Sequence, residues 1–341
     1  MAPVTIKTIA ERLNLHPSTV SRALGGHPNV RPKTREKVLA LANELDYQPN
    51  ILAKSLKERH TRTIGVIVPE IRHYFFSCAI SAIDNRAREN GYAMILCQSA
   101  EQLRNEVMNV SVLEQQRVAG MIVSISQETI SSDHLKSYQR RGGILVLFDR
   151  VSADLVASKV INDNLEGAYM ATEHLIARGY RRIAHLAGPK DLPLTQEREK
   201  GYRKAMQDFN QPVIDDWVVY GGMHERDGME DMDTLLELKE APDAIFTVND
   251  PVAVGAYESI KAHGLEVGTD IGVVGFSNNP TTEIITPSMT TVEQYPGDMG
   301  KRAIECLIEQ IRARRNEEEY APETVVVKTE IIERASTCRT A

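Results

Sequence analysis

The sequence has few cysteines, and they are not arranged in a way that would hold a fold together. Cys78, Cys97, Cys306 and Cys338 stand far apart among 341 residues and form no CxxC pair. Neither a zinc site nor a disulfide framework is therefore indicated. We expect a protein of the reducing cytoplasm.

Long apolar runs are also missing. No segment reaches the roughly 18 to 20 uninterrupted apolar residues that span a bilayer, and residues 1–13 lack the basic start, apolar stretch and cleavage site of an export signal. No GxGxxG opens a first strand–helix unit, and GxxxxGK(S/T), HExxH and GxSxG are absent. We therefore expect neither a membrane protein nor a secreted one, no enzyme, and no cofactor or metal.

What is present is the composition of a folded protein with an uneven charge. Hydrophobic residues make up 42% of the 341 residues, which suits two or more globular units. Residues 1–62 carry 11 Lys and Arg against 5 Asp and Glu, a net charge of +6, whereas residues 63–341 carry 29 against 42, or −13. A basic head on an acidic body indicates a head that binds a polyanion, with nucleic acid as the first candidate, although a merely solvated basic face remains an alternative.

The head has the pattern of a helix-turn-helix. Thr5 can cap a first helix that ends near Leu13, and Pro17 suits the first turn of a second helix that stops at Gly25. A third helix is expected from Pro32 to about residue 45. The second helix leaves a small polar face outward, formed by Ser18, Thr19, Ser21 and Arg22. Such a face suits a recognition helix, because short donors reach phosphates and base edges while Arg can bind guanine.

From Thr63 onward, apolar runs that are typical of buried parallel strands alternate with amphipathic helices. The expected strands cover residues 64–69, 93–97, 120–125 and 144–148 in a first series, and 182–187, 217–220, 244–247, 271–276 and 290–292 in a second. Two doubly wound α/β lobes are implied. Residues 323–334 are expected to form one more strand near the lobe boundary.

Two such lobes place strand carboxyl ends across a cleft, where open α/β sheets bind small molecules. Carboxylates, amides and guanidinium groups follow several of these strands, and aromatic residues 74–76 follow the first. This combination is typical of sugar recognition, since planar polar groups bridge neighbouring hydroxyls. Asp250, at one of these strand ends, is equally explained as a helix cap before Pro251.

Along nearly its whole length, the sequence resembles the lactose-repressor (LacI/GalR) family of bacterial transcription regulators. The runs that carry the resemblance are VTIKTIAERLNLHPSTVSRAL, RPKTREKVLALANELDYQPN and ILAKSLKERHTRTIGVIVPEI in the head and linker, and LFDR, RIAHLAGP, REKGY, FTVNDPVAVGAYESI, IGVVGFSN, TTVEQ and IIERAST in the body.

The resemblance implies an all-α helix-turn-helix head with a hinge helix, followed by a two-lobe α/β domain like the periplasmic binding proteins. The head would be residues 1–48, the hinge helix and linker 49–62, and the effector-binding and dimerisation domain 63–341, with lobe crossovers near 161–164 and 290–295. It also implies a homodimer on double-stranded operator DNA, with recognition helices in adjacent major grooves and a hinge leucine, here Leu56, wedged into the minor groove. Residues after 334 show no apolar heptads for a tetramer bundle.

By the same resemblance, the DNA-binding positions are Thr5, His16, Pro17, Ser18, Thr19, Ser21, Arg22, Asn29, Arg31 and Thr34 in the head, and Asn50, Ala53, Leu56 and Lys57 in the hinge. The effector-binding positions are Phe75, Phe76, Asp149, Arg198, Met223, Asn249 and Ser277.

The sequence departs from the family at several of these places. Thr8 stands where Asp is favoured, Asn14 where Gly is favoured in the turn, and His16 where Ser or Thr would cap the recognition helix. Asn tolerates the left-handed backbone that Gly would occupy, but with His16 a cap of the Ser type is missing. In the body, Ser277 replaces a common Asp and Met223 a common aromatic residue, which implies a changed pocket in which Asn278 is a possible substitute for the carboxylate.

The sequence thus predicts a DNA-binding transcription regulator, most simply a repressor, found in the bacterial cytoplasm and associated with the nucleoid when bound. A small molecule, expected to be a sugar or sugar derivative, would modulate its operator affinity. A free-standing periplasmic sugar-binding protein would share the two-lobe body, but it would carry an export signal and would not need a basic head.

The wedge role of Leu56 has a direct test. Leu56→Ala is expected to weaken binding to a specific operator far more than binding to nonspecific duplex, because only the specific complex kinks the DNA around the inserted side chain. Fluorescence anisotropy with both duplexes measures the two affinities. An equal loss on both would contradict the wedge role.

Overall fold

The chain divides into two compact units, Met1–Thr61 and Arg62–Ala341. The structure, a computed structural model, describes residues 4–47 and 61–339. The hinge helix expected within residues 49–62 falls outside the described residues except for Thr61 and Arg62. In the part of the chain that is described, no helix combines the length and the hydropathy that a membrane span requires.

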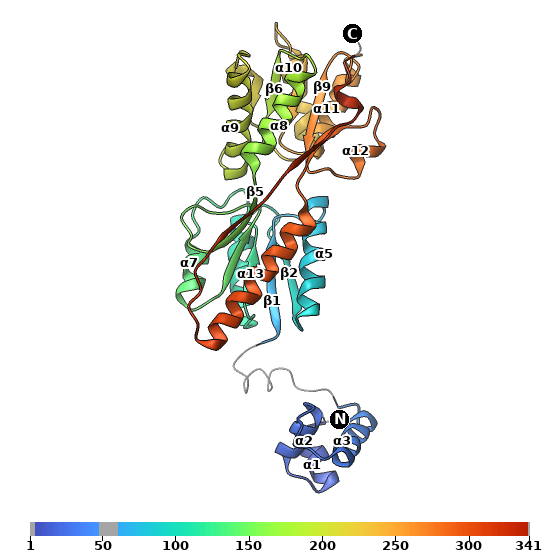
Figure 1. The fold of residues 1–341 in the computed structure, drawn as a ribbon, viewed down its shortest axis with the longest axis vertical. Coiled ribbons are helices and arrows are strands. Elements are labelled where there is room, and N and C mark those ends of the chain that lie inside the picture. Colours follow the sequence, from blue (N-terminus) through green and yellow to red (C-terminus); the bar gives the residue numbers. More distant parts are fainter. Residues whose placement is uncertain (1–3, 48–60, 340–341) are drawn as a thin grey trace. The chain divides into compact units, whose positions relative to one another are not determined.

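The first unit holds three helices, α1 (Ile6–Leu13), α2 (Pro17–Leu24) and α3 (Pro32–Glu44), around a small apolar core (Figure 1). The Thr5 hydroxyl accepts a hydrogen bond from the backbone N–H of Thr8, and the Thr8 hydroxyl accepts one from the N–H of Thr5, so the departure at Thr8 completes a capping box. Asn14 ends α1 at φ 50°, which confirms that Asn occupies the left-handed turn position.

The second unit begins with a parallel sheet covered on both faces. Its order is β11-β5-β4-β3-β1-β2, and β1, β3 and β4 are buried runs rich in Val, Ile and Leu. Helices α5 and α13 cover one face, and α6 and α7 cover the other. The elements of this first lobe are β1 (Thr63–Val68), α5 (Tyr74–Glu89), β2 (Ala93–Gln98), α6 (Leu103–Gln115), β3 (Met121–Val123), α7 (Asp133–Arg140), β4 (Leu145–Phe148) and β5 (Ser158–Asn162), with α13 (Pro296–Asn316) and β11 (Thr324–Val327) from the end of the chain.

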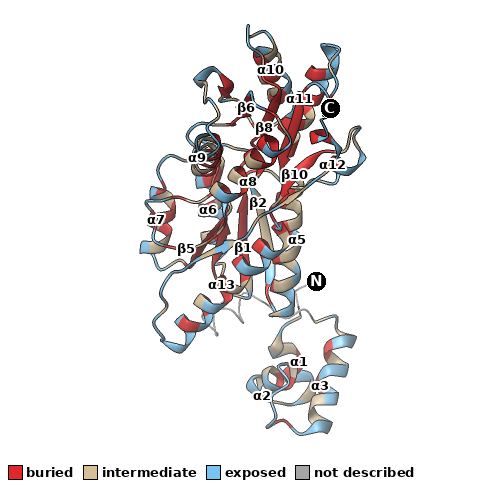
Figure 2. Cartoon of the chain, turned by 45° about the horizontal axis from the view of Figure 1, so that its top comes forward, coloured by how far each residue is buried: buried red, intermediate tan, exposed pale blue. Residues whose placement is uncertain are grey.

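The second lobe repeats this architecture around a sheet of order β12-β10-β9-β8-β6-β7, in which only β12 is antiparallel. Helices α10 and α11 cover one face and α8 and α9 the other, so burial concentrates in the strands and on the inner helix faces (Figure 2). Its elements are α8 (Asn164–Ala177), β6 (Ile183–Leu186), α9 (Pro193–Asp208), β7 (Val218–Val219), α10 (Glu225–Leu236), β8 (Ala244–Thr247), α11 (Asp250–Ala262), β9 (Gly272–Phe276), α12 (Thr281–Ile284), β10 (Thr290–Glu293) and β12 (Glu330–Ile332), with short turns of 3-10 helix at 215–217 and 335–337.

The chain passes three times between the lobes, from β5 to α8, from β10 to α13 and from β11 to β12. The third passage corrects the single strand expected over 323–334: this run is two strands, one in each sheet, and it crosses the second unit as a long dark-red ribbon in Figure 1. Strand β5 was not among the expected strands, because its sequence SKVIN alternates in burial and lacks a continuous apolar run.

Helices α10 and α11 pack so closely that each presents a glycine to the backbone of the other. A Cβ on Gly255 would lie 1.7 Å from the carbonyl oxygen of Glu225, and one on Gly228 would lie 2.0 Å from that of Val252. Both distances are far inside van der Waals contact, so the second lobe closes only with glycine at these two positions.

Gly255→Ala is therefore expected to lower the free energy of unfolding by about 1–3 kcal/mol or more, because the added methyl group must push α10 off α11. Thermal or urea unfolding followed by circular dichroism measures the loss. The matched control is Gly297→Ala in the first turn of α13, where a Cβ meets nothing within 4 Å. The control is expected to equal or slightly exceed the wild type, and equal stability of both variants would disprove the close-packing argument.

Candidate functional site

Helix α2 presents a polar face. Ser18 and Arg22 are exposed and Ser21 is half-buried, whereas Val20 and Ala23 are buried in the core of the head. The pattern separates a packing side from a side that is open to solvent. Small donors and a guanidinium on the open side match the requirements of base and phosphate recognition in a major groove.

His16 caps α2 with a ring nitrogen, in place of the Ser-type cap that the sequence lacks. Its Nδ1 accepts a hydrogen bond from the backbone N–H of Ser18 at 3.3 Å and lies 2.8 Å from the Ser18 hydroxyl oxygen. When Nδ1 accepts from the backbone, the proton of the neutral ring is on Nε2. Nε2 is then the nitrogen that can donate to a phosphate.

The other predicted DNA-binding residues of the head cluster at helix starts and in one loop. Thr5 caps α1, Arg31 precedes α3, Thr34 lies in the first turn of α3, and Asn29 is exposed in the loop between α2 and α3. Free N–H groups and the helix dipole favour phosphate at such positions. Pro17 and Thr19 are half-buried in the first turn of α2. The hinge positions Asn50, Ala53, Leu56 and Lys57 lie outside the described residues.

In the second unit, one buried amide joins the three passages between the lobes. Asn162, at the end of β5, donates from Nδ2 to the carbonyl oxygen of Gln294 at 2.9 Å and to that of Val327 at 3.2 Å. The Gln294 side chain returns a hydrogen bond from Nε2 to Asn162 Oδ1 at 2.9 Å. Asn162 and Gln294 are each 3% exposed, so these bonds form away from solvent. The amide therefore fastens the first passage to the second and the third.

A cavity of about 260 Å³ borders this amide. Its lining comes from the end of β4, the first passage between the lobes, the start of α9 and β11. The lining residues are Asp149, Val151, Ile161, Asn162, Asp163, Asn164, Leu165, Pro193, Leu194, Glu197 and Val326. Carboxylates and amides thus face a space whose remaining wall is aliphatic. A concave site with convergent polar groups at the ends of parallel strands is the arrangement of small-molecule binding in α/β proteins.

Asp149 of the first lobe and Arg198 of the second lobe interact electrostatically. Burial lowers the pKa of Arg198 to about 10, which still leaves the guanidinium charged at neutral pH, and Asp149 opposes that shift. Burial raises the pKa of Asp149, while Arg150 and Arg198 act in the opposite direction. Two buried opposite charges that stabilise each other across the lobes form an electrostatic link that depends on how far the lobes are closed.

Arg198 is also built into the second lobe. Its Nε donates to Asn164 Oδ1 at 2.9 Å, Nη1 donates to the carbonyl oxygen of Val248, and its guanidinium carbon lies 3.7 Å from the ring centroid of Phe276. Cation–π stacking and charge-assisted hydrogen bonds hold it in one orientation. The side chain that links to Asp149 is therefore rigid.

Asn249 has a structural role as the cap of α11. Its Oδ1 accepts from a backbone N–H in the first turn of that helix at 2.9 Å, and its Nδ2 donates to the carbonyl oxygen of Met223 at 2.9 Å. Asn249, and not Asp250, is thus the cap. Asp250 accepts a hydrogen bond from the Thr291 hydroxyl at 2.6 Å, and burial raises its pKa to about 6.

Ser277 and Asn278 are engaged with the chain itself. The Ser277 hydroxyl donates to Gln294 Oε1 at 2.7 Å, and Gln294 in turn donates to Asn162. Asn278 donates to Glu293 at 2.7 Å and accepts from Arg334 at 2.9 Å. Neither residue is among the described residues that line the cavity, so Asn278 does not supply a replacement for a carboxylate there.

Phe75 and Phe76 pack into the core of the first lobe. They are 7% and 4% exposed, meet edge to face with centroids 5.2 Å apart, and Phe76 continues to Phe148 at 6.2 Å. Of the seven predicted effector positions, Asp149 lines the cavity, while Phe75, Phe76, Arg198, Met223, Asn249 and Ser277 are not among its described lining residues.

The sequence reasoning missed Asn162, Asp163, Asn164 and Glu197, which supply most of the polar lining. Asn162 ends β5, and Asp163 and Asn164 follow it directly. Because β5 was not among the expected strands, a search for polar residues at strand ends did not include this segment. An apolar VI pair followed by NDN is the local signal that could have located them.

Two segments of the chain match known protein families. Residues 5–50 match the family model of bacterial regulatory proteins, lacI family, and residues 172–337 match a periplasmic binding protein-like domain. The HTH-type transcriptional repressor PurR of Vibrio campbellii is 34% identical over 330 residues, which cover 95% of this chain and 98% of the relative. The chain belongs to the LacI family of bacterial transcription regulators. It is a DNA-binding repressor and not an enzyme.

Solved structures of the LacI family agree with this fold. The lac repressor dimer bound to operator and the anti-inducer ONPF superposes with a TM-score of 0.86 at 25% identity, over 98% of this chain and 99% of that one. The transcriptional regulator CelR in complex with cellobiose superposes with a TM-score of 0.75 at 27% identity, over 98% and 99%. The two-lobe fold expected from the sequence is confirmed.

The amide that joins the passages generates a stability prediction. Asn162→Ala is expected to lower the free energy of unfolding by about 1–3 kcal/mol, because it leaves Gln294 Nε2 and two buried carbonyl oxygens without this partner. Urea unfolding followed by the fluorescence of Trp217, the single tryptophan, measures the loss. Asn316→Ala, at an exposed position, is the control and is expected to change nothing. Equal stability of the two variants would contradict the structural role of Asn162.

Proposed function

We propose that this LacI-family protein binds a palindromic operator as a homodimer, and that a sugar or sugar derivative in the cavity between its lobes changes its operator affinity. The observation that carries the proposal is the cavity itself, because it takes its walls from the first lobe, the second lobe and the passage between them. A ligand that touches all three has a different affinity for each angle between the lobes. Such a difference is the requirement for allosteric control.

The lining supports a neutral, hydroxyl-rich ligand. Asp149, Asp163 and Glu197 offer carboxylate acceptors, and no described lining residue carries a positive charge. The side-chain amides of Asn162 and Asn164 are engaged with the chain itself. Carboxylate acceptors pair with sugar hydroxyls and would repel a phosphate or carboxylate. The volume of about 260 Å³ lies just below the range of drug-sized sites, which suits a small sugar. The cellobiose bound by CelR shows that this fold accommodates such ligands.

In the head, the proposed base-reading group is Ser18, Ser21 and Arg22, with His16 and Pro17 at the start of the same helix. Thr5, Thr19 and Thr34 would bind phosphates, and Asn29 and Arg31 would bind DNA from the following loop. In the hinge, Asn50, Ala53, Leu56 and Lys57 would contact the operator centre, with Leu56 as the wedge. A homodimer supplies two such sets of residues, which would contact half-sites one turn of the DNA helix apart. The protein would act in the bacterial cytoplasm, where the operator lies in the nucleoid.

The proposed coupling uses the passages as its pivot. A change in the angle between lobes alters the spacing of the two hinge segments in the dimer, which decides whether both fit the operator at once. The size of the effect equals the ratio of effector affinities for the two lobe arrangements. Phe75, Phe76, Met223, Asn249 and Ser277 would act by shaping the walls around the cavity.

The proposal is tested first on a randomised duplex pool. The full chain is expected to select a near-palindrome with a flexible central step, and a panel of sugars is then screened against that duplex by fluorescence anisotropy. Recovery of only salt-sensitive, sequence-independent binding, with every sugar added in turn, would overturn the proposal.

Arg198→Ala is expected to abolish the effector response and to leave operator affinity within about threefold of the wild type, because the head is untouched. Arg203→Ala, on the same helix α9 but paired with Glu199 at the surface, is the matched control and should respond normally. Anisotropy with and without effector measures both quantities, after thermal unfolding has confirmed that each variant is folded. A normal response of the Arg198 variant would remove Arg198 from the coupling.

A further inference from the structure

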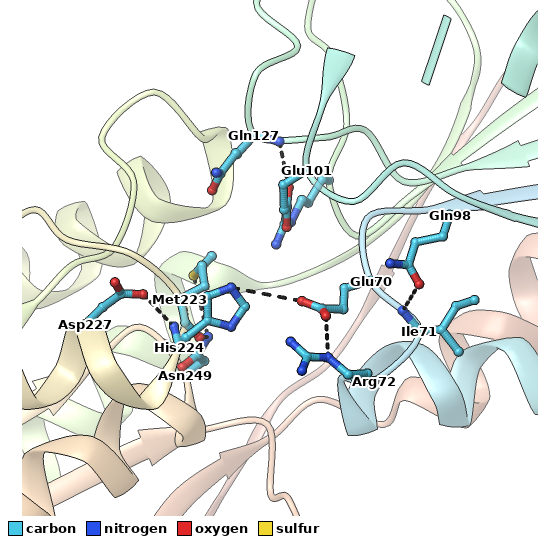
Figure 3. Close-up of polar contacts among 11 residues, drawn as sticks. Glu70, Ile71, Arg72, Gln98, Glu101, Gln127, Met223, His224, Asp227 and Asn249 are labelled. Carbon is cyan, nitrogen blue, oxygen red and sulfur yellow. Dashed lines mark hydrogen bonds and ion pairs between the residues drawn. The ribbon is translucent and has the colours of Figure 1, made fainter. Parts of the chain in front are cut away.

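A second group of side chains from both lobes lies outside the cavity. Glu70 follows β1, His73 precedes the first turn of α5, and His224 precedes the first turn of α10, so two residues come from the first lobe and one from the second. One potential metal-binding atom from each lies within 4.8 Å of those of the other two. His224 Nε2 is 4.0 Å from Glu70 Oε2, as Figure 3 shows, and the two imidazole rings are 5.8 Å apart.

Two imidazole nitrogens and one carboxylate oxygen are a donor set that zinc prefers. Zinc holds such atoms at about 2.0–2.2 Å, which places neighbouring ligands of a tetrahedral site about 3.4 Å apart. The distance of 4.0 Å between His224 Nε2 and Glu70 Oε2 exceeds that value by about 0.6 Å, and the three donor atoms all lie within 4.8 Å of one another. A small closure of the lobes would therefore complete the coordination, with the fourth position left to water.

The protonation and charge around the three residues permit binding. Burial lowers the pKa of His73, and the positive charge of Arg150 lowers it further. Arg72 donates to Glu70 Oε1 at 2.6 Å, while Glu70 Oε2 is the oxygen nearer His224.

Two other charged residues and two helix dipoles act on the same place. Arg150 and the dipoles of α5 and α10 oppose a cation, whereas Glu225 favours one. The dipole effects are each about 0.3–1 kcal/mol and partly screened, which is small beside the binding free energy of a three-ligand zinc site. The arrangement tolerates a divalent ion.

We infer that Glu70, His73 and His224 bind one divalent transition-metal ion, with zinc as the best fit, and that this ion draws the two lobes together. The residues are 154 positions apart at their widest, so no short sequence motif marks them, and the sequence predicted no metal site. The ion would fix the angle between the lobes, and its effect on operator binding rests on the function proposed above.

The experiment uses the full-length protein, stripped with a chelator, and zinc alone as the probe. Isothermal titration calorimetry is expected to show one zinc ion per chain, with an affinity that falls at least about tenfold in His224→Gln and also in His73→Gln. Cobalt(II) is expected to give the visible absorption of a tetrahedral site without thiolate bands. His263→Gln is the matched control, because its side chain is 44% exposed against 45% for His224 and it also lies near a carboxylate.

Closure is measured in the same samples without DNA. Zinc is expected to shorten the distance between fluorophores placed on the two lobes in the wild type and in His263→Gln, and not in His224→Gln. Zinc binding that is unchanged in His73→Gln and His224→Gln, or binding that leaves the interlobe distance constant, would overturn the inference. Because these readouts contain no operator and no sugar, a failure of the proposed effector function would leave them unaffected.

Discussion

The hydrogen bonds of Asn162 are the constraint on which the body of this protein depends. The two lobes have separate sheets and separate cores, and three passages of the chain connect them. One amide group, buried at the end of β5, donates to the second and third passages and accepts from Gln294. Since an unpaired amide in this place would be costly, the three passages are held as one strap.

The charges of the second unit are arranged around that strap. Arg198 reaches from the second lobe towards Asp149 of the first, and Arg150 binds Glu101 at 2.7 Å within the first lobe. These groups are largely buried, so their attraction depends strongly on the distance between them. Under the proposed function, a ligand in the neighbouring cavity would change that distance, and a small number of buried groups would link its binding to the lobe angle.

Much of the fold could be predicted by one rule: helices show apolar residues at helical spacing, and buried parallel strands show continuous apolar runs. The helices of the head and most strands of both lobes follow this rule, as α2 and β8 show. The rule does not reach β5 or the division between β11 and β12, because short half-exposed strands carry little periodic signal. His16 is a similar case: propensity tables rank Ser and Thr as caps, but the ring nitrogen accepts from Ser18 in the same way.

The amino-acid sequence by itself determined the class of the protein, because a basic helix-turn-helix segment and alternating apolar runs are local features that neighbouring residues specify. It also located Asp149 at a strand end. Only the tertiary structure decided that Asn162 would join three passages, that Phe75 and Phe76 would pack into a core, and that His224 would meet Glu70. These contacts join residues that are separated by up to 165 positions along the chain. Their partners are chosen by sheet order and by chain crossing, which no local pattern records.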